Sequence, residues 1–145
     1  MEFKLVIDPA AKEEVTATLH KRTPLADELE ELVLAYGEQI TALSDDEMIR
    51  LSWGDIECLT VENDKTYVIT QDGARYRIRQ RLYEAEARLP AYFIRINKSS
   101  IANRRRIAKF TIAFNGAVDA VFKSGFKEYV SRRCFAEIKR RLNET

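Results

Sequence analysis

The sequence predicts a mainly β protein of the α+β class, with helices at the periphery. Short stretches in which apolar and polar residues alternate recur along the chain, and this period of two is typical of strands. Tight-turn dipeptides separate the stretches: Asn63-Asp64, Asp72-Gly73 and Asn115-Gly116. Strands joined in short succession by such turns favour antiparallel sheets. Three further stretches have apolar residues at helical spacing, and we place these helices around the sheets.

The N-terminal stretch predicts a β-hairpin followed by an amphipathic helix. Phe3–Ile7 and Val15–Leu19 alternate in polarity and are joined through Asp8-Pro9. Thr23-Pro24 is a suitable N-cap and first-turn pair for a helix over residues 24–42. One face of that helix would carry Leu25, Leu29, Leu32, Tyr36 and Ile40.

A change in charge marks the expected domain boundary. Residues 1–46 carry four basic and eleven acidic side chains, a net charge of −7, whereas residues 47–145 carry twenty and twelve, a net charge of +8. We expect an N-terminal extension over 1–46 and the main domain over 47–145. A positive domain suits a polyanionic partner, and the total charge of +1 argues against indiscriminate binding to nucleic acid.

The first half of the main domain predicts four strands and one short helix. The strands are expected over residues 48–53, 56–62, 67–70 and 76–79. Asp72-Gly73 lies between the last two, where the glycine can adopt a positive φ. A helix over 82–89 follows and ends before Pro90, because the residue before a proline disfavours the helical conformation.

The second half predicts further strands and a last helix. The strands are expected over residues 92–97, 107–114, 117–122 and 128–130. Ser131 can cap the helix, whose apolar face carries Cys134, Phe135, Ile138 and Leu142. Between the first two of these strands the chain turns polar, from Asn97 to Asn103.

A basic stretch without any acid runs from Ile94 to Val118. It contains Arg95, Lys98, Arg104, Arg105, Arg106 and Lys109. Such a surface favours an anionic ligand. Charge alone also fits a solvated loop between two core strands, because runs of charge are usually exposed to solvent.

A motif that begins one residue before this stretch favours an anionic ligand over a solvated loop. It reads Phe93-Ile94-Arg95-Ile96-Asn97-Lys98-Ser99, followed by Ile101-Ala102-Asn103 and Ile107. This resembles the signature block of LytTR DNA-binding domains, and the resemblance continues in the family's order over residues 47 to 142. It implies an elongated arrangement of several small antiparallel sheets. It also implies a transcriptional regulator that binds double-stranded DNA at direct-repeat promoter sites.

The resemblance further implies that bases are read from loops at the ends of strands. The base-reading positions fall on Lys65, Lys98 and Arg132. Arginine can donate two hydrogen bonds to the guanine O6 and N7 atoms, and lysine one. We expect positioning contacts to the DNA backbone from Asn97, Ser99, Arg104, Arg105, Arg106 and Arg133. Asn103 is expected to order its turn.

No pattern in the sequence predicts catalysis, a metal or a cofactor. The single histidine, His20, has no nucleophile or carboxylate constellation around it, and Cys58 and Cys134 lie in apolar patterns without partners at zinc spacing. A Gly-rich phosphate loop is absent. We therefore expect a protein that is not an enzyme. No apolar run has the length of a signal-sequence core or a membrane span, so we expect it in the cytoplasm.

The sequence is compatible with more than one role for the N-terminal extension. About 46 residues precede the DNA-binding part, too few for a receiver domain, so the chain resembles the small stand-alone LytTR regulators. Some of these are encoded with an inhibitory membrane protein. The extension could form a homodimer through its apolar stripe, or could fold against the basic domain and screen it. An alternative function is a non-catalytic interaction module whose basic face binds an acidic protein.

Overall fold

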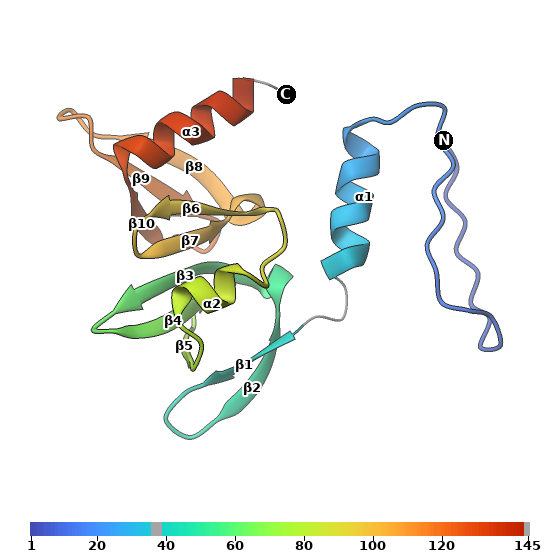
Figure 1. Ribbon diagram of the computed structural model, residues 1–145, viewed down its shortest axis with the longest axis horizontal. Helices are drawn as coiled ribbons and strands as arrows, with labels where there is room; N and C mark the ends of the chain where they lie inside the picture. The colour runs from blue at the N-terminus through green and yellow to red at the C-terminus, as the bar shows by residue number, and fades with distance from the viewer. Residues whose placement is uncertain (36–38, 144–145) are drawn as a thin grey trace.

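The computed structural model describes residues 1–35 and 39–143, and antiparallel strands in two sheets dominate it (Figure 1). The larger sheet has seven strands in the order β2-β1-β5-β4-β3-β7-β6. Their bounds are β1 (Gln39–Leu43), β2 (Met48–Ser52), β3 (Ile56–Glu62), β4 (Lys65–Thr70), β5 (Arg75–Ile78), β6 (Phe93–Asn97) and β7 (Ser100–Asn103). The smaller sheet has the order β10-β9-β8, with β8 (Ile107–Ile112), β9 (Val118–Phe122) and β10 (Lys127–Val130).

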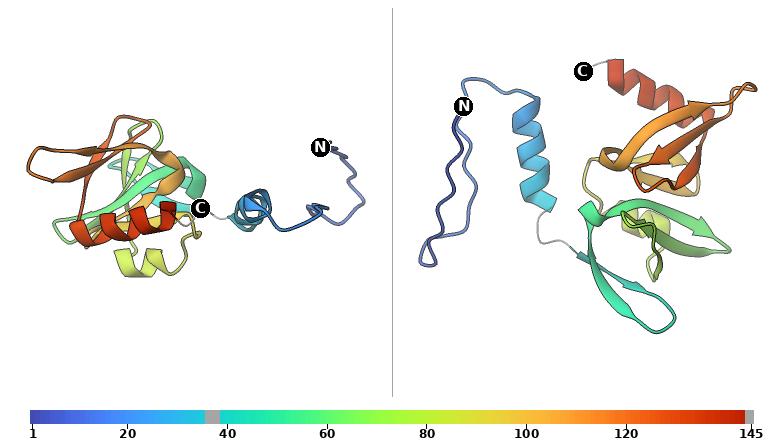
Figure 2. Two further views of the ribbon diagram at one scale, coloured as in Figure 1. Left: turned by 90° about the horizontal axis from the view of Figure 1, so that it is seen from above. Right: turned by 180° about the vertical axis from the view of Figure 1, so that it is seen from behind.

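Three helices and two short 3-10 turns accompany the sheets. The helices are α1 (Pro24–Ala35), α2 (Leu82–Glu86) and α3 (Arg132–Asn143), and the turns are η1 (Trp53–Asp55) and η2 (Arg104–Arg106). α1 and the residues before it lie to one side of the sheets in both further views (Figure 2). The expected fold class, mainly antiparallel β with peripheral helices, is confirmed.

The N-terminal β-hairpin expected from the sequence is wrong, because the chain turns there but forms no strands. Asp8 does turn the chain, because its carbonyl accepts from the Ala11 N–H at 3.1 Å and its carboxylate from the Ala10 N–H at 3.0 Å. Neither arm, however, forms a strand. An isolated two-stranded hairpin is marginal in water. No core covers the apolar side chains of this one, and Phe3 is 88% exposed.

The helix expected over residues 24–42 is also corrected. α1 ends at Ala35, Tyr36 lies outside the described residues, and Ile40 lies in β1. In β1, Ile40 and Ala42 point into the core while Gln39 is exposed. Pairing with β2 and β5 and burial of Ile40 therefore override the helical spacing.

The polar stretch before η2 differs from the expectation as well. Residues 100–103 form β7, which pairs with both β3 and β6, and all four are buried. Ser100 and Asn103 are buried with hydrogen-bond partners, so their polarity does not exclude them from a central strand.

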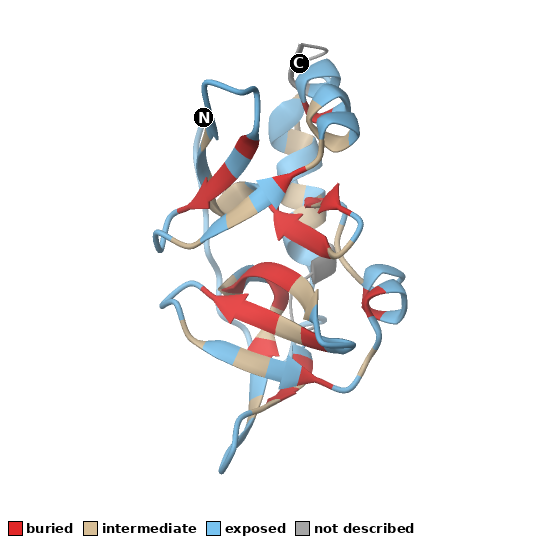
Figure 3. Cartoon of the chain, turned by 90° about the vertical axis from the view of Figure 1, so that its left-hand side faces the viewer, coloured by how far each residue is buried: buried red, intermediate tan, exposed pale blue. Residues whose placement is uncertain are grey.

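Two apolar clusters hold the sheets together. One lies on the larger sheet and includes Trp53, Leu59 and Ile101. The other joins both sheets with α3 and includes Ile96, Phe122 and Ile138. Buried residues accordingly concentrate on the strands (Figure 3). Both cysteines belong to this apolar packing, and burial raises the pKa of the Cys58 thiol well above its usual value.

Because Ile40 lies in β1 and not on α1, shortening its side chain should destabilise the protein. Ile40 is 2% exposed in β1, whereas Leu32 is 59% exposed on α1, although both belong to the same predicted helical stripe. Ile40→Ala should lower the free energy of unfolding by roughly 2 to 5 kcal/mol, because it leaves a cavity in the core. Leu32→Ala is the matched control and should change it by less than about 0.5 kcal/mol. Urea unfolding measures both, and equal effects would contradict the assignment of Ile40 to the sheet.

Candidate nucleic-acid interface

The turn between β6 and β7 carries Lys98, and hydrogen bonds of the Asn97 and Arg95 side chains order it. Asn97 donates its side-chain N–H to the Tyr129 carbonyl at 2.7 Å and accepts from the Ser99 N–H at 2.8 Å. Arg95 donates to the Lys98 carbonyl at 2.8 Å and pairs with Glu86 at 3.1 Å. Lys98 itself is exposed at the tip. The buried Asn97 thus orders the turn from inside the protein.

The turn between β3 and β4 places Lys65 near this tip. Asn63 and Asp64 have φ values of 52° and 63°, the two positive values that a tight hairpin turn requires and that Asn and Asp tolerate. Lys65 follows as the first residue of β4 and is exposed. The Val61 N–H donates to the Ser99 carbonyl at 2.9 Å, which ties the end of β3 to the β6–β7 turn. Lys65 and Lys98 line the same groove.

The junction between β10 and α3 presents Arg132 and Arg133. The Ser131 N–H donates to the Ile96 carbonyl at 2.8 Å, so the junction is bonded to β6. The Ser131 hydroxyl accepts from the Cys134 N–H at 3.1 Å, which confirms the expected helix cap. Both arginines are exposed. The helix dipole disfavours cations at this end, so local helix stability does not account for them.

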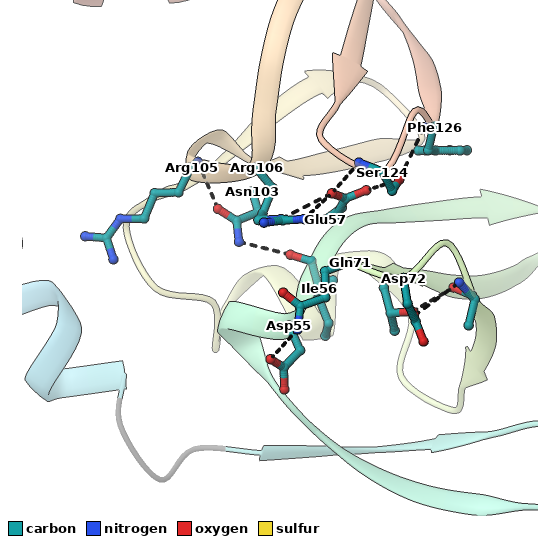
Figure 4. A network of polar contacts seen from close by, with 12 residues as sticks. Asp55, Ile56, Glu57, Gln71, Asp72, Asn103, Arg105, Arg106, Ser124 and Phe126 are labelled. Carbon is teal, nitrogen blue, oxygen red and sulfur yellow. Dashed lines mark hydrogen bonds and ion pairs between the residues drawn. The ribbon is translucent and has the colours of Figure 1, made fainter.

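η2 lies at the other end of β7 from Lys98. The four residues of β7 separate the two ends by about 13 Å, at the usual rise of a strand. Asn103 donates to the Ile56 carbonyl at 3.0 Å and accepts from the Arg105 N–H at 2.9 Å, so it orders this turn (Figure 4).

The three arginines of η2 are all paired within the protein. Arg106 meets the Glu57 carboxylate at 3.0 Å, and Glu57 is 0% exposed. Glu57 also accepts from the backbone N–H and the hydroxyl of Ser124, in the turn between β9 and β10 (Figure 4). Arg105 pairs with Glu31 of α1 at 2.8 Å and lies over the Tyr92 ring at 4.3 Å. Arg104 lies 3.7 Å from the same Glu31 carboxylate.

The expected site residues therefore divide into two groups. Lys65, Lys98 and Arg132 lie on three strand-end segments that hydrogen bonds join. Ser99 and Arg133 belong to the same segments. Arg104, Arg105 and Arg106 lie together at η2, where two carboxylates, those of Glu31 and Glu57, pair with the three of them.

A basic groove beside Lys65 and Lys98 was not anticipated from the sequence. Its volume is about 780 Å³. Its basic lining residues are Lys65, Arg77, Arg79, Arg81, Arg95 and Lys98, and Asp64 is the single acid among them. The spacing of Arg77, Arg79 and Arg81 at every second residue was the available signal.

Comparison with known proteins identifies this fold. A solved LytTr DNA-binding domain, from a Bacillus cereus protein described as a methyl-accepting/DNA response regulator, superposes with a TM-score of 0.65. It is 23% identical in sequence, and the match covers 72% of this chain and 95% of that one. The two antiparallel sheets thus have the fold of LytTr domains. The LytTr DNA-binding domain family matches residues 46–143, and the chain belongs to this family.

Relatives in Staphylococcus aureus are described as uncharacterised HTH-type transcriptional regulators. The protein of strain NCTC 8325 is 35% identical over 99 residues, which are 68% of this chain and 67% of that protein. The protein of the bovine strain RF122/ET3-1 is 37% identical over 89 residues, 61% of this chain and 60% of its own length. Strands separate the three helices of this chain from one another within the described residues, so its basic loops are not presented by a helix-turn-helix.

The described part of the chain contains no group of three or more His, Cys, Asp and Glu side chains placed to hold a metal ion. Among the helices of residues 1–35 and 39–143, none is long and apolar enough to cross a membrane.

The pairing at η2 gives a second prediction. Arg106→Ala should lower the free energy of unfolding by about 3 to 5 kcal/mol, because it leaves the buried Glu57 carboxylate without its cation. Arg104→Ala removes the same charge from the neighbouring exposed side chain and should cost less than about 0.5 kcal/mol. Chemical denaturation of both variants checks this. A small and equal loss for the two would show that the ion pair does not join the sheets.

Proposed function

We propose that this chain is a sequence-specific transcriptional regulator in the cytoplasm that binds direct-repeat promoter sites through strand-end loops. The observation that carries the proposal is the joining of three exposed basic segments, those of Lys65, Lys98 and Arg132, by backbone and Asn97 hydrogen bonds. Membership of the LytTr family supports DNA as the ligand, and the S. aureus relatives support regulation of transcription. We also propose that the protein is not an enzyme.

The proposed readout divides the basic residues by role. Arg132 would donate two hydrogen bonds to the O6 and N7 atoms of a guanine, while Lys65 and Lys98 would each donate one to a base edge. Contacts to DNA phosphate would come from Ser99, Arg104, Arg105, Arg106 and Arg133. For Arg106 the buried pairing with Glu57 competes with that role. Asn97 would position Lys98 by ordering its turn.

Base reading can be separated from phosphate binding by comparing two duplexes. Arg132→Ala should weaken binding to the cognate direct repeat by roughly 1 to 3 kcal/mol and binding to scrambled DNA of equal length much less, because only the cognate site offers the base contact. Lys98→Ala should act in the same direction more weakly. Fluorescence anisotropy on both duplexes measures this.

The control for this experiment is Lys109→Ala, an exposed cation on β8 of the smaller sheet. It should leave the preference for the cognate duplex unchanged. If Arg132→Ala weakens both duplexes equally, Arg132 contacts phosphate. If the unsubstituted protein binds both duplexes equally, the protein is not a sequence-specific regulator, and binding to an acidic protein becomes the better explanation.

We further propose that the part of the expected extension that precedes β1, residues 1–35, forms a homodimer on DNA; residues 39–43 belong to the larger sheet as β1. The support is the exposure of its apolar side chains, among them Leu5, Ile7, Val15, Leu25 and Leu32, which the sheets do not cover. A monomer would hold this apolar surface in water, and surfaces of this kind mark interaction sites. An inhibitory membrane protein is the other proposed occupant.

Two sets of variants distinguish dimerisation from screening. Leu25→Gln together with Leu32→Gln should convert a dimer to a monomer and weaken binding to a double site by on the order of a hundredfold, since the second half-site loses its effective concentration. Glu31→Gln keeps the apolar side chains and should leave the dimer intact. Light scattering and binding assays measure both.

The ion pairs of Glu31 with Arg104 and Arg105 give the competing result. If the extension screens the basic stretch, Glu31→Gln should strengthen DNA binding, because it frees both arginines. A full-length protein that stays monomeric both at micromolar concentration and on a double site would contradict the dimer.

A further inference from the structure

The chain from β5 into α2 presents a row of arginines on one side. Arg75, Arg77, Arg79 and Arg81 are exposed, while Ile78 and Leu82 between and after them are buried. β5 ends at Ile78 and the chain bends at Arg79 and Gln80, after which Arg81 has an extended backbone with φ −72° and ψ 157°. Within β5, side chains two residues apart are spaced by about 6.6 Å. The four arginines therefore form a run of exposed positive charge along one segment of the chain.

Three members of this row form no side-chain ion pair within the described residues, although the Arg81 backbone N–H donates to the Glu84 carboxylate at 3.1 Å. Arg75 pairs with Glu62 and lies over the Tyr67 ring at 3.9 Å. For Arg77, Arg79 and Arg81, no ion pair exists to any residue in the part of the chain that the structure describes. These three line the groove of about 780 Å³ together with Lys65 and Lys98. Its single acidic lining residue, Asp64, leaves the groove strongly positive.

We propose that Arg77, Arg79 and Arg81 form a track for the sugar–phosphate backbone of the DNA whose bases Lys65 and Lys98 contact. The inference rests on the proposed function. A duplex that reaches both lysines lies across the groove that they share with the track. Three guanidinium groups spread along one groove match a polymer with several phosphates better than one small anion.

The track would bind phosphate without breaking an internal ion pair, whereas the phosphate contacts proposed for η2 must break one. Arg104, Arg105 and Arg106 lie at the far end of β7 from Lys98 and are already paired with Glu31 or Glu57. An arginine that must leave a carboxylate to bind phosphate exchanges one ion pair for another. An unpaired arginine displaces only counterions, and the release of these makes binding depend on salt.

The test measures the salt dependence of binding with the full-length protein. Replacing Arg77, Arg79 and Arg81 together by Ala should reduce the magnitude of the slope of log K against log salt concentration by about 2.7, or about 0.9 for each phosphate contact. The reduction should be the same on cognate and scrambled duplexes, and the ratio of the two affinities should be kept. The three single Ala variants should each reduce it by about 0.9, so the result does not depend on the triple variant folding.

Two matched variants separate a local contact from net charge and from packing. Lys109→Ala, Lys123→Ala and Lys127→Ala together remove three exposed charges from the smaller sheet and should leave the slope unchanged. Arg77→Lys, Arg79→Lys and Arg81→Lys together keep the charges and should retain the slope. Equal slopes for the unsubstituted protein and the Ala variants would overturn the track but leave the proposed function standing.

Failure of the proposed function gives a different result. If the unsubstituted protein binds cognate and scrambled duplexes equally, sequence-specific regulation is wrong, while a reduced slope in the Ala variants still supports the track as a site for DNA backbone. If it binds neither duplex at low salt, both proposals are overturned.

Discussion

The buried carboxylate of Glu57 constrains where the two sheets can lie. It sits on β3 of the larger sheet with none of its side chain exposed, and it takes hydrogen bonds from Arg106 in η2 and from Ser124 of the smaller sheet. Removing a carboxylate from water is unfavourable by several kcal/mol unless cations and donors replace the water. The low-energy arrangement is therefore the one that brings η2 and the β9–β10 turn to β3, and this fixes the relative position of the sheets.

The position of the smaller sheet in turn determines the candidate interface. β10 ends beside β6 because the Ser131 N–H bonds to Ile96 and the Asn97 side chain bonds to Tyr129. Arg132 therefore starts its helix next to the turn that carries Lys98. Loops of this kind gain accuracy from the rigid strands beneath them. A change at Glu57, far along the sheet from Lys98, would reach the interface through the placement of the smaller sheet rather than through charge.

The sequence predicts most of the strands because their turns have local causes. Asn63, Asp64, Gly73 and Gly116 adopt the positive φ values that their residue types favour, so these turns form where the dipeptides occur. Ile40 fits helical spacing and strand alternation equally, and only pairing with distant strands decides between them. The ion pair of Glu57 with Arg106 spans 49 residues of chain, and no local pattern reports it. The arginines of the groove were visible as a period of two, but their freedom from acids is a property of the fold.

Net charge is thus a poor guide to where this domain binds a polyanion. The net charge of +8 over residues 47–145 includes Arg104 and Arg105, which share the Glu31 carboxylate of α1, and Arg106, which pairs with Glu57. Two segments of the chain carry three arginines each. Those of η2 are in ion pairs, whereas Arg77, Arg79 and Arg81 along the groove have none within the described residues. At physiological salt, charges that lie farther apart than about 8 Å are largely screened from one another. The local balance of charge therefore matters more than the total. Arg77, Arg79 and Arg81, which line the groove with Lys65 and Lys98 and have no ion pair within the described residues, therefore contribute more to the local field than the paired arginines of η2.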